Sequence, residues 1–238
     1  MSADARVESS SLSLGVAIPA AGRGERMGGR RKPFLELEGE PLLLRSLRPF
    51  LRHPRLGAVA VALSPDDLQT PPGWLTEADP RLKLVQGGAT RGESVWSALQ
   101  ALPGTVNVVA VHDAARPLVN RNIIDRCLAE VEAGRGAVAG WPAVDTLKEV
   151  DTRGRIVRTP DRERIWHAQT PQVFPRDLVM RAYREAWKEG RENTDDAALV
   201  EAVGGEVVMV AASPYNLKVT RPEDLVMAQA FLSLVDDG

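Results

Sequence analysis

The sequence predicts an α/β protein built on a mostly parallel, doubly wound sheet, with one protruding β-hairpin arm. Short apolar runs alternate with amphipathic segments along most of the chain, as in successive βαβ units. The apolar runs are continuous rather than alternating, which is typical of strands that helices cover on both faces. The chain has 238 residues, 44% of them hydrophobic, and this length suits one large domain of that class.

The expected strands are apolar runs that end at glycine or at polar residues. We expect strands at 14–21, 57–63, 81–86, 106–113, 136–140 and 206–212. The expected helices are the amphipathic segments at 41–51, 92–102, 120–133, 176–189, 194–203 and 222–235. Proline is tolerated at the first position of a helix, so Pro41 is predicted to begin the first of them.

Residues 142–166 interrupt the alternation. The segment 146–151, a turn at 152–154 and the segment 155–159 predict a polar β-hairpin. Two strands with so little apolar area are marginally stable alone. We therefore expect a dimerisation arm that leans on a second subunit of a homodimer. The alternative is a solvated flap on the same subunit.

Composition and charge exclude several classes of protein. The net charge of −2 argues against a nucleic-acid partner bound through bulk basicity. The single cysteine, Cys127, excludes an internal disulfide, and it shares a helical face with Ile123 and Val131, so we expect it in the core. Residues 1–13 lack the apolar segment of a signal peptide and are expected to be disordered, ahead of one domain at 14–238. No apolar run approaches a membrane span, so we expect a cytoplasmic protein without a membrane partner.

A loop rich in glycine and cations follows the first expected strand. It contains Gly22, Arg23, Gly24, Arg26, Gly28, Gly29, Arg30, Arg31 and Lys32. Glycines let backbone N–H groups approach an anion, and the cations supply the charge that a polyphosphate needs. The loop lacks the Gly-Lys-Ser/Thr of a Walker A motif, and its glycine spacing and Pro33 fit a Rossmann fingerprint poorly. The sequence therefore predicts a nucleotide-phosphate loop, with a solvated surface loop as the alternative.

An acidic residue ends another strand at the same edge of the sheet. Asp113 follows the apolar run 108–111 and precedes Arg116. Mg²⁺ takes one or two carboxylates together with substrate phosphates, so Asp113 is a candidate ligand for Mg²⁺ or another divalent cation. The alternatives are a helix N-cap and a local Asp–Arg ion pair.

Several motifs, in order over residues 14–232, resemble one family. They are Ala20-Ala-Gly-x-Gly-x-Arg-Met, Gly87-Gly88 with Arg91 and Ser94-Val, Val111-His-Asp-Ala-Ala-Arg-Pro, Trp166-His-Ala-Gln-Thr-Pro-Gln-Val-Phe, Thr194-Asp-Asp-Ala and Asn216-Leu-Lys-Val-Thr-Arg-Pro-Glu-Asp-Leu. Together they resemble the 2-C-methyl-D-erythritol 4-phosphate cytidylyltransferases. That family usually has Pro-Lys-Gln after the loop, where this chain has Lys32-Pro33-Phe34; the lysine is retained, and whether its placement shifts by one residue is open from the sequence.

The resemblance implies a nucleotidyltransferase-type, Rossmann-like fold. It also implies transfer of CMP from CTP to methylerythritol 4-phosphate, with release of pyrophosphate, in the non-mevalonate isoprenoid pathway. It assigns catalysis to Arg26, Lys32, Asp113 and Lys218, with Mg²⁺ on Asp113. It assigns CTP binding to Ala20, Ala21, Gly22, Gly24, Gly87, Gly88 and Ser94. It places Ala114, Arg116, Thr146, Arg162, Thr170 and Thr194 around the sugar phosphate, with Arg162 reaching the neighbouring subunit's site.

Three other functions remain open from the sequence alone. One is a related nucleotidyltransferase that acts on another sugar phosphate or polyol phosphate. A second is a nucleotide-responsive binding protein that has lost turnover, although Arg26, Lys32, Asp113 and Lys218 are all present. The third is a nicotinamide-dependent oxidoreductase, which the glycine spacing disfavours.

Overall fold

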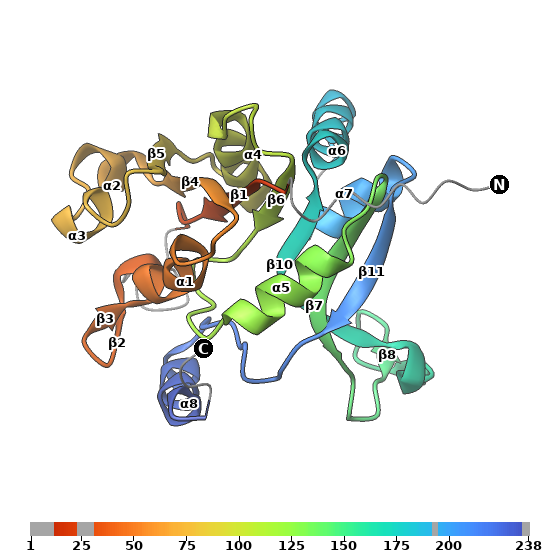
Figure 1. Cartoon of the computed structure of the whole chain (residues 1–238). Helices are drawn as coiled ribbons and strands as arrows, with labels where there is room; N and C mark the ends of the chain where they lie inside the picture. The colour runs from red at the N-terminus through yellow and green to blue at the C-terminus, as the bar shows by residue number, and fades with distance from the viewer. Residues whose placement is uncertain (1–11, 23–30, 192–194, 235–238) are drawn as a thin grey trace.

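The computed structural model describes residues 12–22, 31–191 and 195–234. At its centre lies a seven-stranded sheet in the order β11–β7–β10–β6–β1–β4–β5 (Figure 1). The strands are β1 (Leu14–Pro19), β4 (Leu56–Leu63), β5 (Leu82–Gln86), β6 (Val108–Val111), β7 (Arg135–Pro142), β10 (Trp166–Pro175) and β11 (Glu206–Ala211). Strand β10 runs antiparallel to β6 and β7, and the other strands run parallel to one another. The mostly parallel sheet is confirmed.

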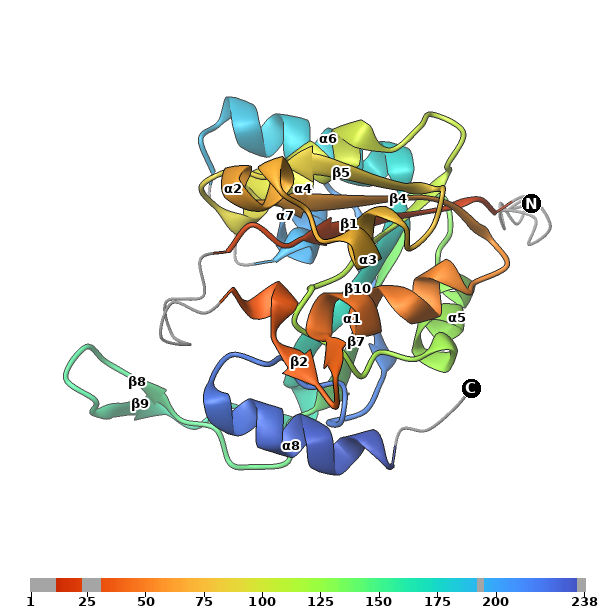
Figure 2. The same cartoon turned by 90° about the vertical axis from the view of Figure 1, so that its left-hand side faces the viewer.

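Helices cover both faces of this sheet (Figure 2). One face carries α4 (Arg91–Ala101), α6 (Arg176–Lys188) and α7 (Asp196–Ala202), which share an apolar core. The opposite face carries α1 (Leu42–Leu51) and α5 (Arg121–Ala129), which pack in a second core. Residues Val16, Ala17 and Ile18 of β1 are all fully buried, which explains why the sequence shows a continuous apolar run there.

Smaller elements complete the fold. The helices α2 (Pro65–Gln69) and α3 (Gly73–Thr76) follow β4, and β2 (Glu36–Leu37) pairs with β3 (Glu40–Pro41). Helix α8 (Pro222–Leu232) packs against β2 in a third apolar cluster, which includes Leu37, Val219 and Ala228. Within the described ranges, no helix has the length and apolar character needed to cross a bilayer.

Strand β10 is the main departure from the predicted elements. Pro171 has no N–H to donate to a sheet, and no local pattern predicted a strand around it. In the structure the pairing of β10 with β7 shifts register between Ala168 and Gln172, so the proline lies where the ladder is already interrupted. Two smaller differences concern helices: Pro41 is the N-cap of α1 rather than its first residue, and α5 ends at Ala129.

The hairpin is confirmed, with shorter strands than expected. Strands β8 (Glu149–Val150) and β9 (Ile156–Arg158) pair antiparallel and project from the body of the domain (Figure 2). Four apolar side chains on this arm are 51–63% exposed: Val144, Val150, Ile156 and Val157. At the base of the arm, the Ala143 N–H donates to the Ile165 carbonyl at 2.9 Å.

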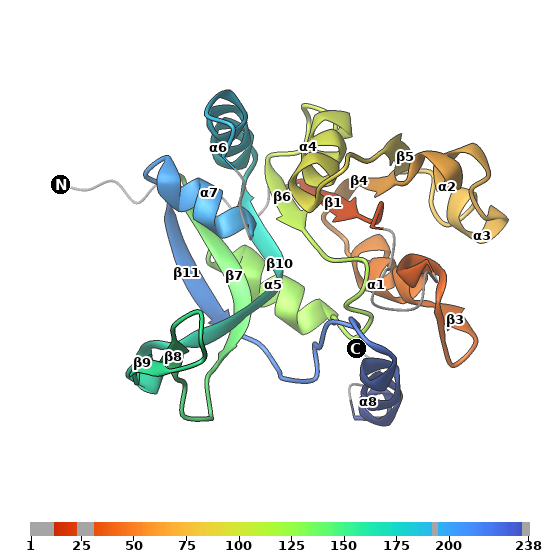
Figure 3. The ribbon, with the colours of Figure 1, turned by 180° about the vertical axis from the view of Figure 1, so that it is seen from behind.

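The order of the strands indicates which edge of the sheet is suited to ligand binding. Strand β1 is followed by β4 on one side, through α1, whereas β6 arrives on its other side, through α4 on the opposite face (Figure 3). In open α/β sheets, ligands bind beyond the carboxyl ends of the strands at such a switch point. The segments after β1, β5 and β6 all begin at this edge. At the opposite edge Ser13, expected to be outside the ordered domain, donates its N–H to Asn107 Oδ1 at 2.9 Å.

Candidate active site

Asp113 lies just beyond the carboxyl end of β6 and collects three cations. Arg91 Nε lies 3.1 Å from Asp113 Oδ1, and Lys218 Nζ lies 2.8 Å from Oδ2. Arg116 Nε is 3.6 Å from Oδ2. The predicted residues Asp113, Arg116 and Lys218 therefore come together, and the local Asp–Arg pair that the sequence left open is present as well.

The cations keep Asp113 ionised despite its burial. The carboxylate is largely buried, and burial alone would raise its pKa. Arg91, Lys218 and Arg116 oppose that effect and hold the pKa of Asp113 well below its usual range. The site therefore presents a permanent carboxylate surrounded by positive charge.

The main chain of Asp113 is held by a buried hydrogen-bond chain. Its N–H donates to Thr170 Oγ1 at 3.0 Å, and the Thr170 hydroxyl lies 2.9 Å from His112 Nδ1. His112 Nε2 lies 3.3 Å from the Arg116 carbonyl, which can only accept. Burial lowers the pKa of His112 to about 3, so the ring is neutral. We therefore assign the hydrogen of His112 to Nε2 and the donated hydroxyl hydrogen of Thr170 to the His112 Nδ1 bond.

The segment carrying Lys218 is fixed by Asn216. The Asn216 amide donates to the Thr170 carbonyl at 2.9 Å and to Gln169 Oε1 at 3.1 Å. The main-chain carbonyl of Asn216 accepts a 2.7 Å hydrogen bond from Arg116 Nη1. Asn216 is 1% exposed, and the two hydrogen bonds that its side-chain amide donates explain why an asparagine stands two residues before Lys218. This anchor places Lys218 beside Asp113.

A second buried carboxylate extends the cluster and was not predicted. Arg91 Nη1 and Nη2 lie 3.1 and 2.8 Å from the two carboxylate oxygens of Asp196, at the start of α7. The Tyr183 hydroxyl also donates to Asp196 Oδ1. Arg91 and Asp196 both stand in motifs that the sequence singled out, but nothing in the sequence showed that they pair across 105 residues.

The predicted CTP-binding segments meet at the same edge. A Cβ added to Gly87 would lie 2.5 Å from the Cβ of Ala21, so only glycine allows the segments after β1 and β5 to approach so closely. Ser94 Oγ donates to the Thr90 carbonyl at 3.0 Å and accepts from the Gly88 N–H at 3.2 Å. Ser94 therefore holds the Gly87-Gly88 turn in place.

The other members of this set are distributed around the turn. Ala20 is buried after β1, and Gly22 is exposed; among the described residues no heavy atom lies within 4 Å of a Cβ placed on Gly22. Ala114, assigned to the sugar phosphate, is buried, and its carbonyl accepts from Ser46 Oγ at 3.0 Å.

Part of the cationic loop lies outside the described residues. Gly24, Arg26 and the Lys32 side chain belong to that part, although the Lys32 backbone begins the 3-10 helix η2 (Lys32–Phe34). Arg31 is described, and it pairs with Asp66 and Asp67 at the start of α2. The protein itself therefore supplies the counter-ions of Arg31.

The remaining predicted residues do not join the Asp113 cluster within this chain. Thr146 and Arg162 are exposed on the arm, where Arg162 Nη1 donates to the Val144 carbonyl at 2.7 Å. In the described part of the chain, neither side chain forms a hydrogen bond or ion pair with the cluster. Thr194 lies outside the described residues.

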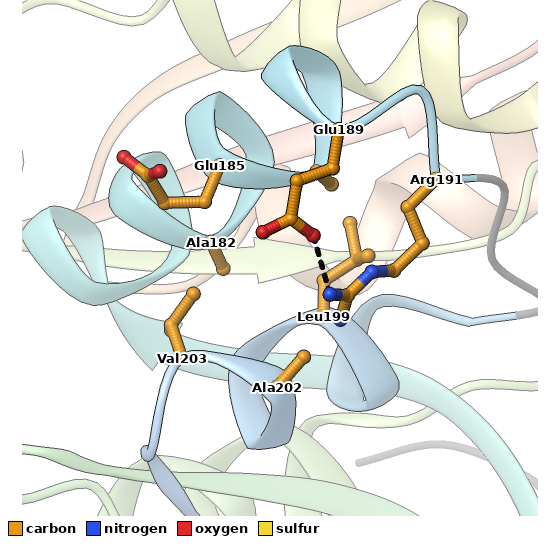
Figure 4. A pocket seen from close by; sticks show the side chains of 8 residues that line it. Ala182, Glu185, Glu189, Arg191, Leu199, Ala202 and Val203 are labelled. Carbon is orange, nitrogen blue, oxygen red and sulfur yellow. Dashed lines mark hydrogen bonds and ion pairs between the residues drawn. The ribbon is translucent and has the colours of Figure 1, made fainter.

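Two cavities lie apart from Asp113. The smaller, about 20 Å³, is lined by residues of α6 and α7 with Arg191, and Figure 4 shows Arg191 beside Glu189 at its rim. It has room for little more than one water molecule. The larger, about 260 Å³, lies between the start of α5 and the segment after β11 and is lined in part by Asn120 and Tyr215.

Comparison with known proteins identifies the family. Residues 14–234 match the family model described as 2-C-methyl-D-erythritol 4-phosphate cytidylyltransferase. A relative of that name from Symbiobacterium thermophilum is 42% identical over 220 residues, which cover 92% of each chain. One from Solibacter usitatus is 40% identical over 235 residues, covering 93% of this chain and 96% of the relative.

Solved structures agree with these matches. The crystal structure of the enzyme of that name from Thermus thermophilus is 34% identical, with a TM-score of 0.75, and the match covers 93% of this chain and 100% of the other. A structure of 4-diphosphocytidyl-2C-methyl-D-erythritol synthase from Anaerococcus prevotii has a TM-score of 0.81 at 26% identity, covering 94% and 99%. The chain therefore belongs to the 2-C-methyl-D-erythritol 4-phosphate cytidylyltransferase family.

Proposed function

We propose that this cytidylyltransferase transfers CMP from CTP to 2-C-methyl-D-erythritol 4-phosphate and releases pyrophosphate, a step of non-mevalonate isoprenoid biosynthesis. The observation that carries the proposal is the Asp113 cluster, which gathers Arg91, Arg116 and Lys218 at the carboxyl edge of the sheet. Family membership decides against the oxidoreductase and the non-catalytic binding protein. A related transferase with a different acceptor is the outcome that the assay below must exclude.

The chemistry that the site must supply is electrostatic. The attacking phosphate monoester is already largely dianionic near neutral pH, because its second pKa is about 6. No general base is needed, so the residues must bring two anions together and stabilise charge on the α-phosphoryl group. We assign to Arg26 and Lys32 the role of stabilising the negative charge on the α-phosphoryl group. Lys218 is 40% exposed beside Asp113 and is suited to hold the acceptor phosphate.

Asp113 fits a divalent cation that is shared with the nucleotide. Its carboxylate is ionised, and its Oδ2 partner Lys218 is exposed enough to move aside. In the described residues, no group of three or more histidine, cysteine, aspartate or glutamate side chains could cage a metal. Mg²⁺ accepts one protein carboxylate when phosphates and water complete its shell, so one aspartate suffices. The cation would neutralise charge on the triphosphate when bound.

The test is pyrophosphate release from each of the four nucleoside triphosphates, with and without methylerythritol 4-phosphate. We expect turnover with CTP and this acceptor, and loss of turnover in excess EDTA that added Mg²⁺ restores. Equal turnover with UTP would contradict specificity for CTP, and turnover only when an unrelated polyol phosphate replaces methylerythritol 4-phosphate would assign the chain to another acceptor. Full activity in excess EDTA would show that the reaction needs no divalent cation.

We also propose a cytoplasmic homodimer in which each arm completes the partner's site. The exposed apolar side chains Val150, Ile156 and Val157 support an interface on the arm, and Arg162 at its base is free of the cluster in its own chain. In that arrangement each subunit lends one arm and receives another.

Mixed dimers test this arrangement. Lys32→Ala and Arg162→Ala homodimers should each be nearly inactive. In a mixed dimer one site carries both defects and the other carries neither. Refolding an equal mixture should therefore recover about a quarter of wild-type activity, if pairing is random. No recovery, or a monomer in sedimentation at assay concentration, would reject the shared site.

A further inference from the structure

Arg91 is held between two carboxylates on opposite sides of its guanidinium group. Its Nε faces Asp113 Oδ1 at 3.1 Å, and its two Nη atoms face both oxygens of Asp196 at 3.1 and 2.8 Å. The bidentate contact is thus made with Asp196, and only one bond remains for Asp113. Bidentate pairs fix the plane of an arginine side chain as well as its position. The direction of the Nε–H bond toward Asp113 is therefore set by Asp196.

Asp196 is built into the fold as a support. Its side chain is fully buried at the start of α7, and it accepts a further hydrogen bond from the Tyr183 hydroxyl. The N–H groups of Asp196 and Ala197 donate to Gln172 Oε1 at 3.1 and 2.9 Å, which ties α7 to β10. A buried carboxylate is costly unless it is paired and hydrogen-bonded, and here every contact serves to hold it against Arg91.

The arrangement gives the two oxygens of Asp113 different environments. Arg91 engages Oδ1, whereas Oδ2 is engaged by Lys218, which is 40% exposed, and more distantly by Arg116 Nε at 3.6 Å. Arg91 itself starts α4, whose N-terminus is fixed by a capping box between Thr90 and Glu93. Both ends of the Arg91 side chain are therefore anchored, which leaves Asp113 with one orientation.

We propose that Asp196 is a positioning residue for the reaction: by holding Arg91 in a bidentate pair, it turns the Asp113 carboxylate so that Oδ2 faces Lys218 and the substrates. Without the negative charge of Asp196, Asp113 is the one counter-ion left to Arg91 among the described residues, and Arg91 is free to take both of its oxygens. Asp113 would then turn away from Lys218. The inference rests on the proposed function where it is tested by kcat, and on the geometry of Arg91 alone where it is tested by the Arg91 resonance.

The test compares Asp196→Asn with wild type by kinetics and by the ¹⁵N–¹H resonance of the Arg91 Nε group, identified by its loss in Arg91→Lys. Asp196→Asn should lower kcat about 10–100-fold, the range for losing a group that orients a ligand or catalytic residue. The KM for CTP should change by less than about threefold, because Asp196 does not touch the substrate in this assignment. The Arg91 resonance should shift and exchange faster with water.

Asp79→Asn is the matched control. Asp79 pairs with Arg81 through Nε and Nη2 at 2.8 and 2.7 Å, but at the opposite edge of the sheet, so its loss should leave kcat unchanged. Arg91→Lys keeps the charge and loses the fork, and it should lower kcat by a factor similar to Asp196→Asn. Because Asp196 acts through Arg91, adding Asp196→Asn to Arg91→Lys should cost less than about threefold more.

Three results would overturn the inference. They are an unchanged kcat in folded Asp196→Asn, an unchanged Arg91 resonance, and fully additive losses in the double variant. If Asp196→Asn fails to fold, Arg91→Lys decides the question, and wild-type kcat in that variant would reject the positioning role. Absence of CTP turnover in the wild-type protein would instead refute the proposed function, while the Arg91 resonance would still report the geometry.

Discussion

Thr170→Val removes one hydroxyl from the hydrogen-bond chain that holds Asp113 and leaves the shape of the side chain almost unchanged. The hydroxyl accepts from the Asp113 N–H at 3.0 Å and donates to His112 Nδ1 at 2.9 Å. Thr170, His112 and Asp113 are all buried, so water cannot replace the lost partner at either group. The variant therefore leaves one buried donor and one buried acceptor unpaired.

The magnitude follows from these two groups. An unsatisfied buried polar group costs about 1–3 kcal/mol, so the free energy of unfolding should fall by about 2–6 kcal/mol. The same geometry limits the substrate role that resemblance assigns to Thr170. Its hydrogen is already donated to His112, so toward a substrate the hydroxyl can only accept a hydrogen bond from a hydroxyl group. It cannot donate to a phosphate oxygen.

Urea unfolding followed by tryptophan fluorescence measures the effect. Thr170→Ser is the control, because it keeps the hydroxyl and loses a methyl group, at a cost of about 0.5–1.5 kcal/mol. In Thr170→Val, kcat should also fall, since the main chain of Asp113 loses its anchor. The reasoning is refuted if Thr170→Val unfolds at the wild-type urea concentration and only the KM for the acceptor rises. That result would make Thr170 a substrate ligand without a structural role.

Three further predictions concern other parts of the molecule. Burial lowers the pKa of His112 to about 3, whereas an unfolded histidine takes up a proton below about pH 6.5. Below about pH 6.5 the unfolded state therefore binds more protons than the folded state. The free energy of unfolding should then fall by up to about 1.4 kcal/mol for each unit by which the pH drops. Urea titrations between neutral pH and about pH 5 measure this fall, and a flat profile would contradict the prediction. Cys127 is fully buried, and burial raises the pKa of its thiol to about 12. Cys127→Ala should therefore lower the free energy of unfolding by about 1–2 kcal/mol and leave kcat unchanged. Loss of turnover in a folded variant would show that the thiol has a functional role. Lys32→Ala should lower kcat about 10²–10³-fold, the scale for one preorganised charge, and a change confined to the KM for CTP would show ground-state binding only.

Local sequence patterns predicted the parts of the fold that depend on burial and turns. The apolar run from Leu14 became a strand that is buried on both faces, and Cys127 lies in the core with Ile123, as their shared helical face requires. The hairpin at 142–166 also followed from its turn, where Gly154 has a φ of +76°, a conformation that favours glycine. In each case, residues close together in the sequence are enough to predict the local structure.

The supports of the site could not be predicted in this way. Thr170 reaches Asp113 because β10 inserts between β6 and β7, and a proline within β10 conceals that strand in the sequence. Asp196 reaches Arg91 because α4 and α7 lie on the same face of the sheet. The two motifs that contain Asp113 and Lys218 pointed to residues that the structure brings into contact. Thr170 lies 57 positions from Asp113, and Asp196 lies 105 positions from Arg91, so only the topology brings each pair together.

The charge of the site differs from the charge of the whole protein, and this difference explains how a chain with a net charge of −2 can serve anionic substrates. Arg91, Arg116 and Lys218 carry three positive charges against the two carboxylates of Asp113 and Asp196. These carboxylates keep the cations together in the absence of substrate, because three unpaired cations at this spacing would repel one another. One positive charge remains in excess among these residues, at the edge of the sheet where β1 and β6 end. A focused local field of this kind raises the concentration of an anionic ligand at the site, whereas the overall charge does not.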